Sequence, residues 1–327
     1  MKCINKRLLA VILMCVCMLP LTGCSDVPDP NAYRVYETSF QLGITKSSPL
    51  SAAITYASDL CVTDGSDIGT DQAASHVAYG AGVFNVSKQQ VTYAQSVFDQ
   101  MYPASTTKIL TCYIALKYGD LDEVFTVSEN ACKQDKDAAV AKLKPGDKIT
   151  LRELLYGLML VSGNDAAVAI AEGISGSEEA FADLMNKEAA ALGATKFHFV
   201  TSNGLHRDDH YTTVYDMYLI FNAAIKNEQF REIIGTLNYT ANVTREGTGT
   251  VQLSWDSTNR YLTGKQPVPE GITVIGGKTG TTTQAGYCLV LYSQNEKGDD
   301  IISIVFHGDS RKNLYYLMDE LLTKFAG

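Results

Sequence analysis

The chain has 327 residues, of which 46% are hydrophobic and 19% are charged, with a formal net charge of -9 at pH 7. This composition is sufficient for the core of one large domain or of two interlocked lobes. The acidic balance argues against nucleic acid as a partner. No cluster of histidine and cysteine has the spacing of metal ligands, so we expect neither a metal nor a cofactor.

The N-terminal segment has the pattern of an export signal. Three basic residues within the first seven positions precede an apolar run at 8–19, which is too short to span a bilayer comfortably. Leu-Thr-Gly-Cys at 21–24 then resembles the lipobox of bacterial lipoproteins. We therefore expect a signal peptide over 1–23, a lipid on Cys24 and anchoring at the outer face of the bacterial cytoplasmic membrane. An ordinary signal peptide or an uncleaved anchor is the alternative.

Residues 24–50 are polar and irregular, which is typical of a tether between a lipid and a domain. We expect the domain to occupy 51–327. Four cysteines fall within it: Cys61, Cys112, Cys132 and Cys288. They are widely spaced and mostly in apolar surroundings, so we expect buried free thiols, although an exported protein can form disulfides.

The first structural signals of the domain are a hairpin and a buried helix. Two strand-like runs at 77–86 and 91–94 flank a polar turn, which predicts a β-hairpin. The run at 105–118 is hydrophobic nearly all round and predicts a helix inside the protein. Pro103 suits the start of that helix and Gly119 suits its end.

A helical region follows a mixed polar stretch at 120–148. The capping box at 150–153 begins a helix that breaks at Ser-Gly-Asn 162–164. We expect three further helices: one over 165–172 that ends at Gly173, one from about 178 to about 193, and one from Thr213 onward.

Strands return after about 236. We expect strands at 273–278, 285–293 and 301–307 and a closing amphipathic helix at 312–325. Strands at both ends of the domain with helices between them predict an α+β fold. Its antiparallel sheet would be built from both ends of the chain and flanked by helices, with an all-helical insert lobe over about 120–235.

Ser-Thr-Thr-Lys at 105–108 has the residues of an activated nucleophile. A hydroxyl and an amine one turn apart at the start of a buried helix can activate a serine without a histidine. Lys108 can take the Ser105 proton only when it is neutral. Burial, together with a second cation at Lys278, would lower its pKa toward that state. The structural alternative is that Ser105 is simply an N-cap.

Two further motifs follow, Ser-Gly-Asn at 162–164 and Lys-Thr-Gly at 278–280. Ser162 can carry the proton to a leaving amine, and Asn164 can bind the substrate amide and orient the lysine of the first motif. By itself, Ser-Gly-Asn is also typical of a turn between two helices.

The three motifs in this order resemble those of the penicillin-recognising serine enzymes. Over roughly 75–325 the chain is similar to the low-molecular-mass penicillin-binding proteins, the serine-type D-alanyl-D-alanine carboxypeptidases. The resemblance extends to the stretches 102–104, 203–205, 210–213 and 259–260. It implies the β-lactamase/transpeptidase fold and an acyl-enzyme on Ser105.

The resemblance also implies the rest of the site. Lys278 and Thr279 would bind the terminal carboxylate of a D-Ala-D-Ala peptide, with Gly280 leaving the groove open. The backbone N–H groups of Ser105 and Thr281 would form the oxyanion hole. Arg311 lies where members of the family place another arginine that faces the carboxylate.

These features predict a D,D-carboxypeptidase that removes the terminal D-Ala from peptidoglycan stem peptides and binds β-lactams covalently. A class A-like β-lactamase is one alternative, but such enzymes have a glutamate after the second motif that activates the deacylating water. The stretch 197–205 contains no carboxylate, which favours the carboxypeptidase. The other alternative is a non-catalytic wall-binding lipoprotein. Beyond the closing helix we expect neither the β-domain nor the amphipathic membrane helix of many relatives, and the N-terminal lipid would replace that anchor.

His210 and Asp216 raise the possibility of a Ser-His-Asp triad. Both lie at the predicted start of a helix, where we expect capping residues, and Lys108 already supplies a base. We therefore leave both outside the site, and we expect Asp165 to be structural as well.

Overall fold

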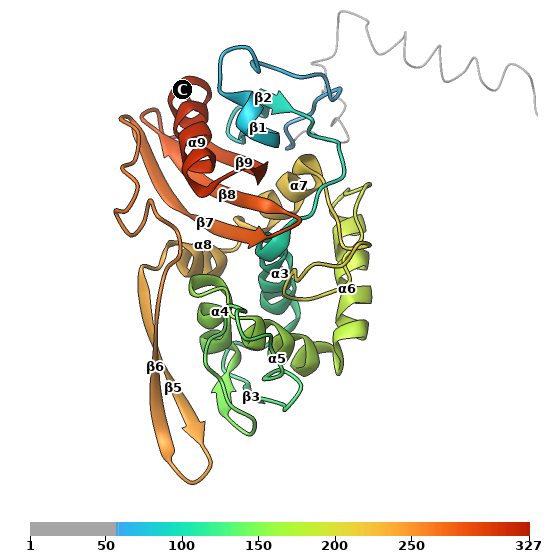
Figure 1. Cartoon of the computed structure of the whole chain (residues 1–327), viewed down its shortest axis with the longest axis vertical. Coiled ribbons are helices and arrows are strands. Elements are labelled where there is room, and N and C mark those ends of the chain that lie inside the picture. Colours follow the sequence, from blue (N-terminus) through green and yellow to red (C-terminus); the bar gives the residue numbers. More distant parts are fainter. Residues whose placement is uncertain (1–56, 58) are drawn as a thin grey trace, which may run out of the picture. The chain divides into compact units, whose positions relative to one another are not determined.

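Strands from both ends of the described chain pair in one five-stranded antiparallel sheet, in the order β2-β1-β9-β8-β7 (Figure 1). Its strands are β1 (Ala78–Asn85), β2 (Gln90–Gln95), β7 (Ile272–Thr282), β8 (Gly286–Asn295) and β9 (Asp300–Gly308). Strands β1 and β9 are far apart in the sequence but adjacent in the sheet, where Ala81 lies opposite Val305. The prediction of a sheet assembled from the two ends of the domain is therefore confirmed.

The computed structural model describes residue 57 and residues 59–327. The expected signal peptide, the lipid-bearing Cys24 and the tether lie outside the described residues, so they stay predictions. Among the helices of the described part, none combines the length and the apolar character that a membrane crossing requires.

The side chains of the five-stranded sheet enter two separate cores, because successive residues of a strand point to opposite faces. Val83 packs in the core beneath α9 (Arg311–Phe325), which is the closing helix that the sequence predicts. The next residue, Phe84, belongs to the larger core that contains α3 (Lys108–Tyr118) and α7 (Val214–Ala224). One face of the sheet is thus covered by α9 and the other by helices of the middle of the chain (Figure 1).

The predicted buried helix at 105–118 begins differently from the expectation. Ala104–Thr107 form a short 3-10 turn, η2, and α3 starts only at Lys108. Ala104 has a φ of 48°, in the left-handed region that a residue with a Cβ rarely adopts. Ser105 therefore lies on a tight turn in front of the α-helix.

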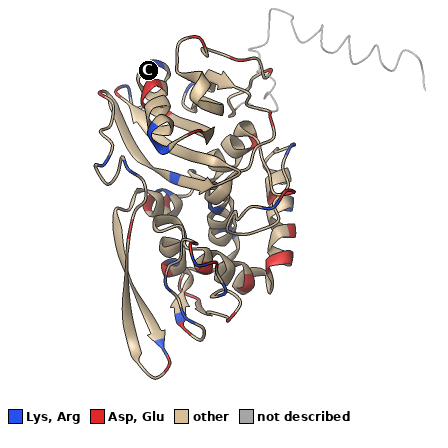
Figure 2. Ribbon diagram, in the orientation of Figure 1, with Lys and Arg blue, Asp and Glu red and all other residues tan. Residues whose placement is uncertain are grey.

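The helical lobe contains the predicted helices and one more. They are α4 (Leu151–Leu160), α5 (Asn164–Ser175), α6 (Glu178–Ala191), α7 and the unpredicted α8 (Glu228–Gly235). The capping box is complete, because Thr150 Oγ1 accepts from the Glu153 N–H and the Glu153 carboxylate accepts from the Thr150 N–H. Acidic positions lie along α6, whereas basic positions lie at the start of α9 and within β7 (Figure 2).

Helix α5 passes the glycine at which the sequence predicts its end. It continues through Gly173 to Ser175 and ends at Gly176, which has a φ of 81°. Phe125 of β3 (Val124–Thr126) explains the glycine, because a Cβ at position 173 would lie 2.3 Å from its ring. The residue therefore makes room for packing and does not end the helix.

A second sheet, in the order β3-β4-β5-β6, borders the helical lobe and was not predicted as such. Its other strands are β4 (Lys148–Thr150), β5 (Asn238–Arg245) and β6 (Gly249–Asp256). The hairpin β5–β6 extends well beyond the neighbouring helices (Figure 1). Near the base of this hairpin, Trp255 Nε1 donates to the Ala141 carbonyl at 3.0 Å. This hydrogen bond fixes the loop around Ala141, which precedes α4 and α5 in the chain.

Candidate active site

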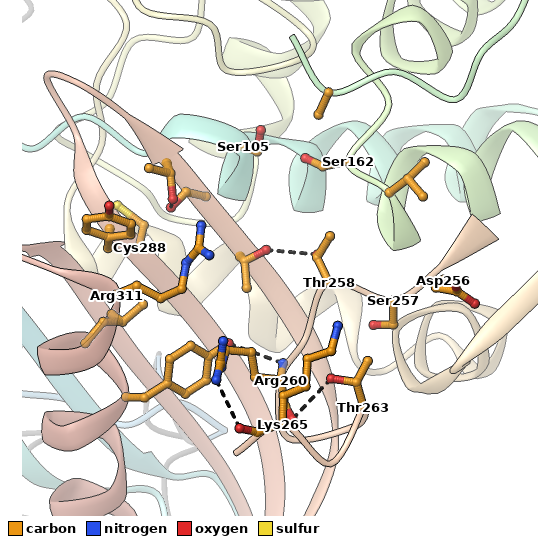
Figure 3. A pocket seen from close by; sticks show the side chains of 18 residues that line it. Ser105, Ser162, Asp256, Ser257, Thr258, Arg260, Thr263, Lys265, Cys288 and Arg311 are labelled. Carbon is orange, nitrogen blue, oxygen red and sulfur yellow. Dashed lines mark hydrogen bonds between the residues drawn. The ribbon is translucent and has the colours of Figure 1, made fainter. Parts of the chain in front are cut away.

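The three sequence motifs meet between the end of β7 and the helical lobe (Figure 3). The turn η2 and the start of α3 supply Ser105 and Lys108, the loop between α4 and α5 supplies Ser162, and β7 supplies Lys278. Three elements that are distant in the chain thus contribute to one cleft of about 540 Å³.

Lys108 makes three short contacts from a fully buried position. Its Nζ lies 3.0 Å from Ser105 Oγ, 2.8 Å from Asn164 Oδ1 and 2.6 Å from the Asn203 carbonyl oxygen. A neutral amine has two N–H donors and one lone pair. If the donors serve Asn164 and Asn203, the lone pair faces the Ser105 hydroxyl, as a general base requires.

The electrostatics of Lys108 favour that neutral form. Burial, followed by the charge of Lys278, holds the pKa of Lys108 well below that of an ordinary lysine, and Asp165 opposes this shift. Burial also lowers the pKa of Lys278 to about 7. Two ammonium groups in one buried site are unfavourable, because each loses hydration on burial and each repels the other.

Lys278 faces the second motif. Its Nζ donates to Ser162 Oγ at 3.0 Å and to the Thr279 carbonyl at 2.9 Å. Ser162 has a φ of 61°, a strained value for a residue that is not glycine. Such strain is typical of a functional side chain that surrounding contacts keep in place, here a hydroxyl that lines the cleft.

Gly280 allows β7 to lie directly against the turn that contains Ser105. A Cβ at position 280 would lie 3.0 Å from the backbone nitrogens of Ser105 and Thr106 and from the Pro103 carbonyl. The glycine therefore permits close approach of two backbones, in addition to the open groove that the resemblance implies. The neighbouring Thr281 is exposed on the cleft, and its hydroxyl donates to the Gly280 carbonyl at 2.7 Å.

The remaining predicted substrate residues line the same cleft. Thr279 lies on its wall, where its hydroxyl shares a 3.0 Å hydrogen bond with that of Thr258. Arg311 is exposed at the start of α9, with its guanidinium 5.8 Å from the centre of the Tyr287 ring. Lys108, Asn164 and Lys278 are buried behind this surface.

Two site features were not predicted. The Asn203 carbonyl contacts Lys108, although the sequence drew attention only to the Asn-Gly-Leu stretch that contains it. Arg260 and Lys265 line the cleft as well; the resemblance included the stretch 259–260 without giving Arg260 a role, and nothing in the sequence drew attention to Lys265.

Asp165 has a structural place next to the site. Its carboxylate accepts from the backbone N–H groups of Ala141 at 2.7 Å, Leu143 at 3.0 Å and Ala166 at 2.9 Å. Burial raises its pKa. Asp165 therefore fixes the loop around Ala141 next to Ser162. This agrees with the structural role that the sequence led us to expect.

The side chains of His210 and Asp216 hydrogen-bond to neighbouring loops, so their interpretation as capping residues is wrong. Thr213 caps α7 by accepting from the Asp216 N–H, whereas the Asp216 carboxylate accepts from two loop N–H groups at 195 and 196. His210 Nδ1 accepts from the Val200 N–H at 3.0 Å, its Nε2 lies 2.9 Å from Thr107 Oγ1, and burial lowers its pKa to about 3. In the described structure neither side chain hydrogen-bonds to the proposed nucleophile.

Solved structures with a similar fold are DD-peptidases. The Streptomyces K15 DD-transpeptidase matches with a TM-score of 0.68 at 30% identity, over 75% of this chain and 96% of that one. The D-alanyl-D-alanine carboxypeptidase from Mycobacterium tuberculosis H37Rv matches with a TM-score of 0.66 at 27% identity, over 75% and 89%. The chain thus has the predicted fold, that of the transpeptidases and β-lactamases.

The sequence comparisons narrow this class to one family. The family model of Peptidase S11, D-alanyl-D-alanine carboxypeptidase, matches residues 69–310, and the chain belongs to this family. D-alanyl-D-alanine carboxypeptidase DacF of Bacillus subtilis (strain 168) is 32% identical over 244 residues, 73% of this chain and 59% of that protein.

Two further relatives agree. The D-alanyl-D-alanine carboxypeptidase of Streptomyces sp. (strain K15) is 34% identical, over 71% of this chain and 81% of that protein. DacA of Escherichia coli (strain K12) is 35% identical, over 68% and 54%. The chain therefore spans little more than half the length of the Bacillus and Escherichia relatives.

Proposed function

We propose that the protein is a serine-type D,D-carboxypeptidase that removes the terminal D-Ala from peptidoglycan stem peptides. The observation that carries this proposal is the contact of a buried lysine with the Ser105 hydroxyl, in which Lys108 Nζ lies 3.0 Å from Ser105 Oγ. Membership of the D-alanyl-D-alanine carboxypeptidase family supports the same substrate class.

In the proposed acylation, Ser105 Oγ attacks the carbonyl carbon of the D-Ala-D-Ala amide while Lys108 accepts the hydroxyl proton. The C–N bond then breaks, and a proton passes to the leaving amine by way of Ser162, whose hydroxyl accepts a hydrogen bond from Lys278. Free D-Ala departs and leaves an ester on Ser105. Water hydrolyses this ester, with the neutral lysine or Ser162 as base.

Substrate orientation would come from the cleft wall. The terminal carboxylate would bind at Lys278, Thr279 and Arg311, since cationic and hydroxyl donors suit a carboxylate. The backbone N–H groups of Ser105 and Thr281 would stabilise the oxyanion. The close packing of β7 against η2 supports this last assignment, because it keeps both backbones at the cleft surface.

The same nucleophile would attack β-lactams. In that adduct the leaving group stays tethered through the opened ring and blocks the approach of water. No carboxylate lies in the stretch 197–205 to activate a water, in contrast to class A-like β-lactamases. We therefore expect slow release of a penicilloyl group and repeated turnover of a D-Ala-D-Ala peptide.

Two measurements on one preparation test this function. After addition of stoichiometric penicillin, the intact mass should show an adduct that persists for many minutes. In a digest the adduct should lie on the peptide that contains Ser105, and Ser105→Ala should form no adduct. An unblocked sample should release free D-Ala from a pentapeptide. An adduct that clears within seconds while penicillin is consumed would favour the β-lactamase. Absence of labelling and of D-Ala release would favour the non-catalytic wall-binding lipoprotein.

We also propose that a lipid on Cys24 attaches the protein to the outer face of the cytoplasmic membrane. The Leu-Thr-Gly-Cys sequence at 21–24 after an apolar run supports this, and two acyl chains are enough for stable attachment. Cys24→Ser should move the protein out of the membrane fraction without loss of penicillin binding. An unmodified Cys24 in the mass spectrum of the mature protein would contradict the proposal.

A further inference from the structure

The hairpin β5–β6 presents a row of uncharged hydrogen-bonding side chains to solvent. Because side chains alternate between the two faces of a strand, every second residue of the hairpin lies on the same face. The outward positions along the middle of the hairpin form three cross-strand pairs, and all of them are exposed. We call this set the polar face: Thr240 opposite Ser254, Asn242 opposite Gln252, and Thr244 opposite Thr250.

The other face of the hairpin packs on the helical lobe. Val243 is buried there, and the Tyr239 ring stacks on the Tyr156 ring with 3.8 Å between their centres. Toward the tip, the Arg245 guanidinium donates to both oxygens of the buried Asp147 carboxylate at 2.8 and 2.7 Å. Contacts near both ends of β5 therefore keep the polar face in place.

The polar face lacks the charges that usually protect an exposed strand. Natural proteins commonly place lysine or other charged residues on edge strands, because these discourage pairing with another chain. In the described part of the chain β6 is the edge of its sheet, and its one charged residue is Asp256, the last of the strand. Figure 2 shows few charged positions along the hairpin. The hydroxyl and amide groups of the face offer donors and acceptors to an uncharged polar ligand.

The polar face continues into the active-site cleft. Asp256 follows Ser254 on the same side of β6 and lines the cleft, and in Figure 3 it lies on the opposite side of the cleft from Arg311. Two residues later, the Thr258 hydroxyl shares a 3.0 Å hydrogen bond with that of Thr279, which the proposed function assigns to the terminal carboxylate. A ligand that leaves the cleft past Asp256 therefore meets the polar face.

The proposed substrate has a part that suits this surface. A stem peptide is joined to a glycan, and the four residues between the bond that is cut and the sugar span roughly 15 Å when extended. The glycan therefore stays near the cleft. Its N-acetylated hexosamines carry hydroxyl and amide groups, which complement the side chains of the polar face. Each strand of the hairpin has eight residues, about 26 Å in length, which exceeds the length of a disaccharide unit.

We propose that the polar face binds the glycan strand of peptidoglycan, so that the enzyme favours stem peptides attached to a strand over free ones. This inference rests on the proposed function, which assigns the cleft to stem peptides. Binding uses hydrogen bonds alone, and no bond of the glycan forms or breaks. A peptide that pairs with the β6 edge would instead use the backbone of β6, and the side chains of the polar face would not contribute.

The kinetic test compares kcat/KM of the full chain on a free pentapeptide and on uncross-linked glycan strands that carry the same pentapeptide. Asn242→Ala/Gln252→Ala removes the two amides in the middle of the face, which hydrogen-bond to each other at 3.3 Å. Gln72→Ala/Gln90→Ala removes two exposed amides outside the hairpin and is the matched control. Two hydrogen bonds correspond to roughly five- to thirtyfold. We expect the first variant to lose this factor on strands, with the free pentapeptide, penicillin acylation and the thermal midpoint unchanged.

Direct binding separates this inference from the proposed function. Glycan strands from which an amidase has removed every stem peptide, labelled at one end, should bind wild type and Ser105→Ala equally in fluorescence anisotropy, and Asn242→Ala/Gln252→Ala should bind them more weakly by the same factor. If wild type binds these strands but neither labels with penicillin nor releases D-Ala, the proposed function fails while the glycan site stands.

Three outcomes would overturn the proposal even beside efficient D-Ala release. They are equal kcat/KM values for wild type and the Asn242→Ala/Gln252→Ala variant on strands, an equal loss in the matched control, and absence of binding to the peptide-free strands. A concentration-dependent dimer in sedimentation velocity that the variant abolishes would assign the polar face to a second copy of this chain and would also overturn it.

Discussion

At the scale of single residues, the proposed chemistry depends on two buried lysines, Lys108 and Lys278. The state in which both are charged has a high free energy. An ordinary lysine at pH 7 is neutral in fewer than about one molecule in a thousand. Burial and the Lys278 charge lower the pKa of Lys108, and its contacts with Asn164 and Asn203 account for two N–H donors. A serine can therefore be activated without histidine, and the one buried histidine near the motif, His210, instead joins a loop to Thr107.

Lys108→Arg tests the base directly. Arginine retains the charge but does not deprotonate in proteins, so it cannot accept the Ser105 proton. We expect penicillin acylation to fall by at least about a hundredfold, the usual contribution of a general base. Stopped-flow acylation rates give the result, with thermal unfolding as the control for folding. Acylation at the wild-type rate would remove Lys108 from this role.

The pH dependence of acylation follows from the same pair. Acylation needs neutral Lys108, so its rate should rise with pH as this amine loses its proton and then reach a plateau. Because the pKa of Lys108 is lowered, the rising limb should lie well below pH 10.5. Lys278→Met removes a like charge, which raises the pKa of Lys108 and moves the limb to higher pH. A limb that stays at the same pH in this variant would show that the two amines are not coupled.

At the scale of secondary structure, the site depends on the contact between β7 and η2. Gly280 places the strand so close to the turn that a Cβ would approach the Ser105 and Thr106 nitrogens to 3.0 Å. On the opposite side, Trp255 and Asp165 fix the loop around Ala141 next to Ser162. A strand thus positions Ser105, the proposed nucleophile, and a loop anchored to a hairpin positions Ser162, the proposed proton relay.

Gly280→Ala should separate stability from catalysis. The added methyl group requires β7 or η2 to shift by a few tenths of an ångström, which misplaces Ser105 relative to the oxyanion donors. We expect acylation to slow by more than about tenfold, since misplacement of 1 Å can reduce a rate by about a hundredfold. The thermal midpoint should change little, because the position borders a cleft. A large fall in the midpoint with normal acylation in the folded fraction would contradict this explanation.

At the scale of the whole described unit, the fold is stabilised by packing without covalent cross-links. Cys61, Cys112, Cys132 and Cys288 are all free thiols, as predicted, although Cys132 is only half-buried. Burial raises the pKa of Cys112 and of Cys288, which makes their thiolates rare at neutral pH. The apolar helix α3 lies within the larger core that joins the sheet to the helical lobe.

A reducing agent should therefore leave the thermal unfolding midpoint unchanged. A disulfide typically contributes about 2–4 kcal/mol, which for a domain of this size corresponds to a midpoint shift of several degrees or more. Differential scanning calorimetry with and without dithiothreitol measures this. A fall of several degrees in dithiothreitol, together with fewer than the expected free thiols by titration under denaturing conditions, would show that a disulfide forms.

Local signals in the sequence were sufficient to predict most elements. The capping box at 150–153, the hairpin around 87–90 and the closing helix depend on residues within a turn or two, so short patterns determine them. The three motifs also led to the fold class through their resemblance to those of the penicillin-recognising serine enzymes, which have the same residue types in the same order. Gly173 was misinterpreted, since its reason lies in the distant ring of Phe125.

Only the tertiary structure decided which groups meet. The Asn203 carbonyl on Lys108, the contact of Lys278 with Ser162 and the place of Arg260 in the cleft join residues with no common local pattern. Such contacts follow from how helices and strands pack, and packing is set by the whole core. The sequence alone therefore determined which chemistry is available, whereas the fold determined the positions, burial and pKa shifts on which that chemistry depends.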